Sequence, residues 1–128
     1  PDHLDAANDL GVVLTELGDL EGAVRAFSQA RRIDPSDVEV RFNLAGALLA
    51  ARRPGEAIQE AKGALAGLPK QGDLALRFVR LLWKAAIVAL EADDLPSARD
   101  AWGAITALDR PDNRWKDSAS ELLRRYGK

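Results

Sequence analysis

The stretch ELGDLEGAVRAFSQARRIDP, residues 16–35, returns in a weaker form as AARRPGEAIQEAKGALAGLP, residues 50–69. Corresponding positions of the two stretches hold the same or a similarly apolar residue in four places: Ala23 and Ala57, Phe27 and Ala61, Ala30 and Ala64, and Pro35 and Pro69. The two copies are therefore 34 residues apart, and the next matching alanine, Ala98, follows Ala57 after 41 residues. A period of this length is typical of chains that stack copies of one small unit.

The first unit has the pattern of two helices joined by a short turn. Gly18 and Asp19 interrupt an apolar stripe with helical spacing, and Asp19 is suited to cap a second helix. Pro35 prevents that second helix from continuing. The stripe of the first helix consists of Ala7, Leu10, Leu14 and Leu17, and the face of the second consists of Leu20, Ala23, Val24, Phe27 and Ala30. Each unit is thus predicted to be a helical hairpin, which buries both faces only when hairpins stack.

These residues resemble the tetratricopeptide repeat. The resemblance is carried on a 34-residue period by Leu10-Gly11, Gly18-Asp19, Ala23, Phe27, Ala30 and Pro35. It implies an all-α fold, a right-handed α-solenoid of three antiparallel helical hairpins plus a C-terminal capping helix. We expect a single domain over residues 1–128, with repeats at 4–37 and 38–71, an extended third repeat at 72–111 and the capping helix at 112–126. The sequence departs from the family pattern at Ala7, Leu14, Arg41, Ala61 and Arg53-Pro54.

The third unit differs from the first two because it is longer by seven residues. Residues 72–94 can form one helix of about twenty residues, whose partner is expected to begin near Leu95. Seven residues are close to two full turns, so the insertion lengthens the helix and keeps its apolar face nearly in line. After Pro111, Asp112 is expected to cap the last helix. The apolar face of that helix consists of Trp115, Ala119, Leu122 and Tyr126.

Composition and residue types argue against several classes of function. The net charge is -2, which favours neither nucleic acid nor an anionic membrane surface, and no apolar run is long enough to span a bilayer. The chain has no cysteine, no glycine-rich phosphate loop, and a single histidine, His3, near its start. The adjacent carboxylates Asp93 and Asp94 could suggest a metal site or an acid/base pair, but Asp94 lies where a helix cap is expected and no further ligand cluster accompanies the pair. We therefore predict no catalytic residues, no metal site and no cofactor.

Family resemblance implies a binding surface on the first helices of the hairpins, which line a concave groove in tetratricopeptide repeat proteins. The positions carried over to this chain are Asn8, Val12, Phe42, Asn43, Gly46, Arg77, Arg80, Trp83, Lys84 and Ile87, with Thr15 and Leu49 beside them. The apolar members form a strip, and the cations Arg77, Arg80 and Lys84 form a basic edge. Such a surface suits a peptide with apolar side chains and an acidic residue or carboxylate. The alternative is that Trp83 is a core residue and that the cations are only solvated.

One subfamily, the chaperone-binding carboxylate clamp, binds the C-terminal carboxylate of a peptide through a lysine, two asparagines and two further basic residues. Asn43, Arg80 and Lys84 match that set, whereas Asn8 and Val12 stand where the lysine and the first asparagine are expected. The match is incomplete, which favours a more general peptide with acidic and apolar character.

The sequence therefore predicts a non-enzymatic module that binds a protein or peptide, within a larger adaptor or scaffold protein. Since the numbering starts at Pro1 without a methionine, the chain is expected to be a piece of such a protein. One alternative is self-association through exposed apolar residues of the long helix. A second is RNA binding, which is disfavoured because the cations are scattered over many faces among twenty acidic residues.

Overall fold

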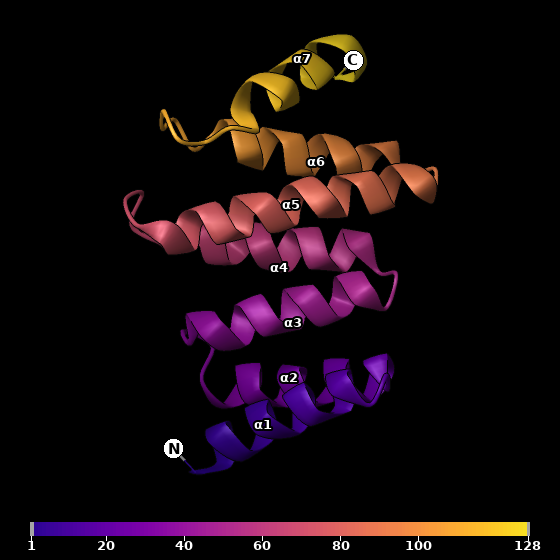
Figure 1. Ribbon diagram of the computed structural model, residues 1–128, viewed down its shortest axis with the longest axis vertical. Helices are drawn as coiled ribbons and strands as arrows, with labels where there is room; N and C mark the ends of the chain where they lie inside the picture. The colour runs from indigo at the N-terminus through magenta and orange to yellow at the C-terminus, as the bar shows by residue number, and fades with distance from the viewer. Residues whose placement is uncertain (1, 128) are drawn as a thin grey trace.

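Seven helices and no strand make up residues 2–127, the part of the chain that this computed structural model describes (Figure 1). In chain order the helices are α1 (Asp2–Glu16), α2 (Leu20–Ile33), α3 (Val38–Ala50), α4 (Pro54–Ala66), α5 (Asp73–Glu91), α6 (Leu95–Thr106) and α7 (Lys116–Tyr126). None of these helices combines the length and the apolar character that crossing a membrane requires.

The helices stack as antiparallel hairpins along the long axis of the molecule. Successive helices lie side by side in Figure 1, with α1 at one end of the stack and α7 at the other. The long helix α5 has 19 residues, against 13 in α3, and it extends beyond its neighbours. The all-α solenoid predicted from the repeat is therefore confirmed.

The core is built from the small and aromatic residues that recur with the repeat. The recurring positions are buried in all three second helices: Ala23, Phe27 and Ala30 in α2, Ala57, Ala61 and Ala64 in α4, and Ala98, Trp102 and Ile105 in α6. The alanines allow neighbouring helices to approach closely, while Phe27 and Trp102 fill the wider spaces.

The turn inside each hairpin is closed in the same way. Gly18, Arg52 and Asp93 occupy equivalent positions, and their φ angles are all positive, at 83°, 62° and 57°. In each hairpin the next residue donates its N–H to the carbonyl five residues before it, at 2.8 to 2.9 Å. Asp19 and Asp94 then cap the second helices by accepting backbone N–H bonds, as predicted.

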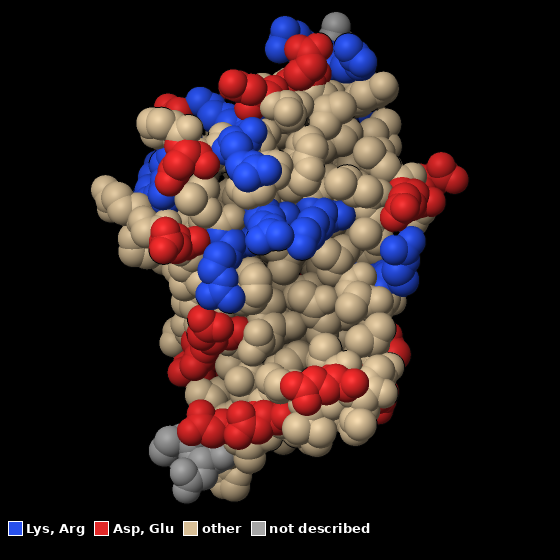
Figure 2. All heavy atoms as spheres, viewed as in Figure 1, with Lys and Arg blue, Asp and Glu red and all other residues tan. Residues whose placement is uncertain are grey.

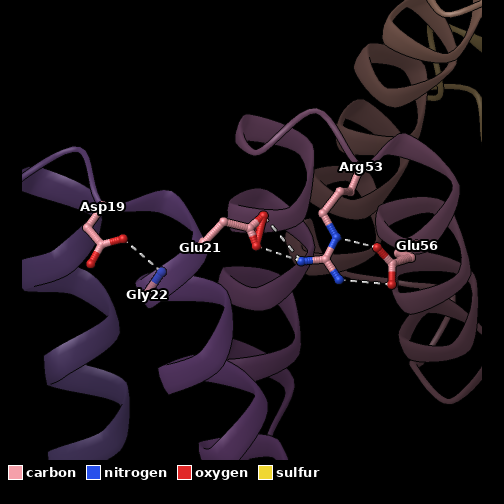
Figure 3. A network of polar contacts seen from close by, with 5 residues as sticks. All are labelled: Asp19, Glu21, Gly22, Arg53 and Glu56. Carbon is pink, nitrogen blue, oxygen red and sulfur yellow. Dashed lines mark hydrogen bonds and ion pairs between the residues drawn. The ribbon is translucent and has the colours of Figure 1, made fainter.

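In the second hairpin the residue before the second helix is Arg53, whose side chain has no oxygen with which to cap it. Its guanidinium forms two hydrogen bonds with Glu56, and its Nη1 lies 3.1 Å from Oε2 of Glu21 on α2 (Figure 3). The bonds from Arg53 hold the pKa of the Glu56 carboxyl below its usual value. Arg53 thus links the second hairpin to the first, although exposed ion pairs contribute little to stability.

The apolar stripe predicted for the first helix is only partly buried. Ala7, Gly11 and Leu14, spaced by four and three residues, form the inner face of α1. Leu10 and Leu17 are instead 52% and 75% exposed. These two members of the predicted stripe are therefore not part of the core, because no helix in the described range covers the outer side of α1.

The capping role predicted for Asp112 is wrong. The last helix begins only at Lys116, and Asp112 forms an ion pair with Arg110, with 2.7 Å between Nη2 of the arginine and Oδ2 of the aspartate. The buried side chain of Asn113 binds two backbone carbonyls at the C-terminal end of α6. This anchor holds the segment as a turn, so α7 starts after it.

Phe27 packs directly against the backbone of Gly11. A Cβ atom added to Gly11 would overlap the ring of Phe27, which is 3% exposed. The equivalent pair in the second hairpin is Ala45 and Ala61. The large ring of Phe27 is therefore faced by glycine, whereas the smaller Ala61 is faced by alanine. The first hairpin therefore depends on glycine at this position.

Replacing Gly11 with alanine is expected to lower the free energy of unfolding by about 1–2 kcal/mol, because the added methyl group displaces a buried ring. The matched control is Gly103→Ala in α6, where a Cβ atom would meet nothing within 4 Å. That change should raise the free energy of unfolding by about 0.5–1 kcal/mol, since alanine favours a helix more than glycine does. Urea denaturation followed by circular dichroism compares the two, and shifts of the same sign would contradict the packing.

Candidate functional site

A hollow of about 320 Å³ lies between α3 and α5. Its lining consists of Phe42, Gly46, Leu49, Arg77, Arg80, Leu81 and Lys84. In Figure 2, Lys and Arg side chains gather in a row over α5, whereas Asp and Glu side chains gather over α1. Six residues predicted for the groove are thus brought together at one place: Phe42, Gly46, Leu49, Arg77, Arg80 and Lys84.

Phe42 and Arg77 form one wall of the hollow. The rings of Phe42 and Phe78 meet edge to face, with their centroids 5.2 Å apart. The guanidinium carbon of Arg77 lies 4.4 Å from the centroid of Phe42, and its Nη1 lies 3.3 Å from Oε1 of Glu39. Arg77 is therefore in contact with α3 on two sides, and Glu39 is its ion-pair partner.

Arg80 and Lys84 are the cations of the hollow that remain available to a ligand. Both are exposed, and neither side chain forms an ion pair or hydrogen bond within residues 2–127. Beside them, the half-buried Leu49 and the buried Leu81 form an apolar floor. Leu81 was not among the predicted site residues, although its position one turn after Arg77 on the same helix pointed to it.

Other predicted site residues do not line the hollow. Nδ2 of Asn43 donates to Oδ1 of Asn8 at 3.1 Å, which links α3 to α1. Val12 and Ile87 are exposed on α1 and α5, while Trp83 is half-buried and packs against the core. The structure gathers the basic edge around Phe42 and leaves the rest of the apolar strip outside the hollow.

The adjacent carboxylates of the third hairpin have a structural role. Oδ1 of Asp94 accepts the backbone N–H of Ser97 at 3.1 Å, which confirms its interpretation as a cap. Asp93 lies in the turn with a positive φ angle. Within residues 2–127, no group of three or more His, Asp or Glu side chains is placed to hold a metal ion.

A second hollow, of about 330 Å³, lies where the C-terminal ends of α4 and α6 meet the start of α5. Its lining consists of Lys62, Leu65, Ala66, Leu68, Pro69, Lys70, Ala75, Ala104, Ala107 and Leu108. Nζ of Lys62 lies 2.8 Å from Oδ1 of Asp100, and this bond lowers the pKa of the Asp100 carboxyl. No sequence motif predicted this hollow, because its lining comes from the ends of several helices. We favour the first hollow as the candidate site, since two cations without such partners, Arg80 and Lys84, lie side by side there, whereas among the described residues the second hollow has only Lys70.

Comparison with known proteins agrees with the helical-hairpin geometry. The family model described as Tetratricopeptide repeat matches residues 8–72. The search of curated protein sequences gave no match. Among solved structures, the chain is similar to the type III secretion translocator chaperone SycD of Yersinia enterocolitica, with a TM-score of 0.59 and 19% sequence identity. The alignment covers 97% of this chain and 90% of that chain, and at this identity the similarity is one of fold.

Proposed function

Because the chain belongs to the tetratricopeptide repeat family, we propose that it is a non-enzymatic module that binds another protein. Its ligand is a peptide segment with an apolar side chain and a nearby carboxylate, bound in the hollow between α3 and α5. The module serves as the interaction part of a larger adaptor or scaffold protein. The fold that it shares with a translocator chaperone agrees with a role in binding proteins.

The observation that carries this proposal is the pairing of an apolar floor with two unpaired cations. Arg80 and Lys84 are spaced by one helical turn, so both side chains can reach one carboxylate. Leu49 and Leu81 form the floor on which an apolar side chain of the ligand loses contact with water. A volume of about 320 Å³ lies at the lower end of the range for ligand pockets, so the hollow accepts one or two side chains.

The neighbouring groups do not form a full clamp for a terminal carboxylate. The amide of Asn43 is bonded to Asn8, and Val12 has no polar group with which to bind a carboxylate. The anion contacts are therefore limited to the α5 cations, which bind a carboxylate from an aspartate, a glutamate or a chain end.

The proposal is tested by selecting binders from a phage-displayed library of random short peptides. We expect the selected peptides to combine a large apolar residue with an acidic residue. Arg80→Glu together with Lys84→Glu should weaken their binding at least about tenfold, because two attractive charges become repulsive. Fluorescence anisotropy of a labelled selected peptide measures the dissociation constant.

The matched control is Arg124→Glu together with Arg125→Glu on α7, which changes the net charge equally at a distance from the hollow. Both arginines are exposed, and within residues 2–127 they pair only with Glu121 on their own helix. This control should change the dissociation constant less than about twofold. Equal losses in both variants, or selected peptides without acidic residues, would exclude the hollow as a specific site.

The alternative of self-association rests on the long helix α5. Ile87 and Leu90 are 48% and 43% exposed near the end of α5. Two copies that bury these residues against each other would form a dimer, and light scattering at increasing concentration would show a rising mass. A constant monomer mass would exclude this alternative and leave the peptide-binding proposal unaffected.

A further inference from the structure

The outer face of α1 carries an apolar stripe that nothing in the described chain covers. Leu10, Val13 and Leu17 are 52%, 49% and 75% exposed, and they are spaced by three and four residues along one side of the helix. Three large aliphatic side chains aligned on one helix face form a contiguous apolar surface, unlike the isolated exposed leucines that are common in monomeric proteins.

The second hairpin shows what kind of element covers this face. Leu44 and Ala47 of α3 are the equivalents of Leu10 and Val13 in the 34-residue repeat, yet they are only 3% and 4% exposed. They are buried because α2 of the preceding hairpin packs on that face, where Val24 shares a hydrophobic cluster with them. The stripe on α1 therefore has the geometry of a surface that packs against a helix.

An acidic edge runs beside the stripe. Asp5, Asp9 and Glu16 are exposed on α1, between the stripe and the side that bears Val12. None of these three carboxylates forms an ion pair with another residue in the range 2–127. In Figure 2 the acidic side chains over α1 form a separate group from the basic row over α5.

The position of Asp9 indicates that the acidic edge lies on the side of α1 that corresponds to the side of α3 facing the preceding hairpin. Its equivalent in the second hairpin is Asn43, which reaches back from α3 to Asn8 on the preceding first helix. A neighbour placed against α1 in the same way would meet the carboxylate of Asp9 with its own polar groups. That neighbour needs cations to neutralise the edge.

We infer that the outer face of α1 is a second docking site, separate from the hollow, and that its occupant is an amphipathic helix of a partner protein with cations along one edge. Its apolar face packs on Leu10, Val13 and Leu17, as α2 packs on α3. Its lysines or arginines pair with Asp5, Asp9 and Glu16. A second copy of the chain is a poorer occupant, because two α1 helices packed antiparallel bring the acidic edges of both copies together.

The test uses a synthetic helical peptide of about four turns, with leucine and alanine along one face and lysine at all other positions. A matched peptide carries glutamate in place of every lysine. We expect the chain to bind the lysine peptide, with an affinity that falls as salt is added, and to bind the glutamate peptide at least about tenfold more weakly. Fluorescence anisotropy measures both dissociation constants.

Substitutions on the chain locate the site. Leu10→Ser with Leu17→Ser, and separately Asp9→Asn with Glu16→Gln, should each weaken binding of the lysine peptide at least about fivefold. The matched control Leu90→Ser removes an equally large exposed aliphatic residue from α5 and should leave the dissociation constant unchanged. All these side chains are exposed, and circular dichroism verifies that each variant is folded.

Three results would overturn the inference. The two peptides could bind equally, the α1 variants could bind the lysine peptide as well as the original chain does, or the original chain could be a dimer in sedimentation velocity that Leu10→Ser with Leu17→Ser makes monomeric. The last result would identify a second copy as the occupant. Failure of this site leaves the peptide selection for the hollow unaffected, because the two tests use different residues and ligands of opposite charge.

Discussion

Replacing Trp102 with alanine is expected to lower the free energy of unfolding by about 3–5 kcal/mol, the range for removing a large buried aromatic side chain. Trp102 is 1% exposed and belongs to the core that joins the second and third hairpins. Its ring centroid also lies 6.4 Å from that of Tyr126, so the indole supports the docking of α7. A loss of this size approaches the total stability of a small domain.

The matched control for this prediction is Trp83→Ala, which removes the same indole from a half-buried position on α5. Because Trp83 buries less apolar area on folding than Trp102 does, this variant should lower the free energy of unfolding by only about 1–2 kcal/mol. Urea denaturation followed by circular dichroism measures the free energy of unfolding of both variants. Equal losses for the two tryptophans would show that Trp102 is not the centre of the core.

The helices and their turns could be predicted from the sequence because local chemistry determines them. The caps Asp19 and Asp94 act on N–H groups within one helical turn, so a short window of sequence contains the whole interaction. The position of the long helix α5 follows equally from spacing, since seven inserted residues preserve the helical face. The repeat period then arranges these hairpins into a solenoid.

Burial could be predicted less well, because it depends on which neighbour is present. The pattern of Leu10 and Leu17 correctly indicates an apolar side of α1, but periodicity does not reveal whether another helix covers that side. In the second hairpin the same pattern is buried at Leu44 because α2 precedes it. An apolar stripe therefore predicts an interface and leaves the other half of that interface undefined.

In the candidate site, too, a feature set by one helix could be predicted, whereas a feature set by contacts between two helices could not. Arg80 and Lys84 share a face of α5, as their spacing predicts. The sequence did not reveal that Glu39 forms an ion pair with Arg77, because the two residues lie on different helices. Of the three predicted cations of the basic edge, two therefore lack a partner among the described residues.

The structural role of Asn113 could not be predicted from the sequence. An asparagine two residues after a proline is typical of an exposed turn, yet this side chain is 5% exposed. Its Nδ2 donates to the carbonyl oxygens of Ile105 and Leu108, at 2.9 and 2.8 Å. The two bonds attach the segment before α7 to the end of α6, over separations of eight and five residues.

Replacing Asn113 with aspartate is expected to lower the free energy of unfolding by about 3–5 kcal/mol at neutral pH, because a buried charge is left without a partner. The side chain keeps its shape, but a carboxylate oxygen now faces two carbonyl oxygens and no donor. Asn113→Ala is the control: it loses the same two bonds without adding a charge, and should cost about 2 kcal/mol.

The pH dependence of the free energy of unfolding distinguishes the effect of the buried charge from the effect of the two lost hydrogen bonds. Burial disfavours the ionised form, so the pKa of the introduced carboxyl is raised in the folded state above its unfolded value of about 3.9. The destabilisation is therefore greatest above the raised pKa and declines as the pH falls through it, because the protonated acid can donate to one carbonyl. Urea denaturation at pH 7 and at lower pH should show that the free energy of unfolding of the aspartate variant approaches that of the original chain as the pH falls. The difference between the alanine variant and the original chain should stay constant. A constant difference for both variants would mean that residue 113 is exposed to water, contrary to the structure.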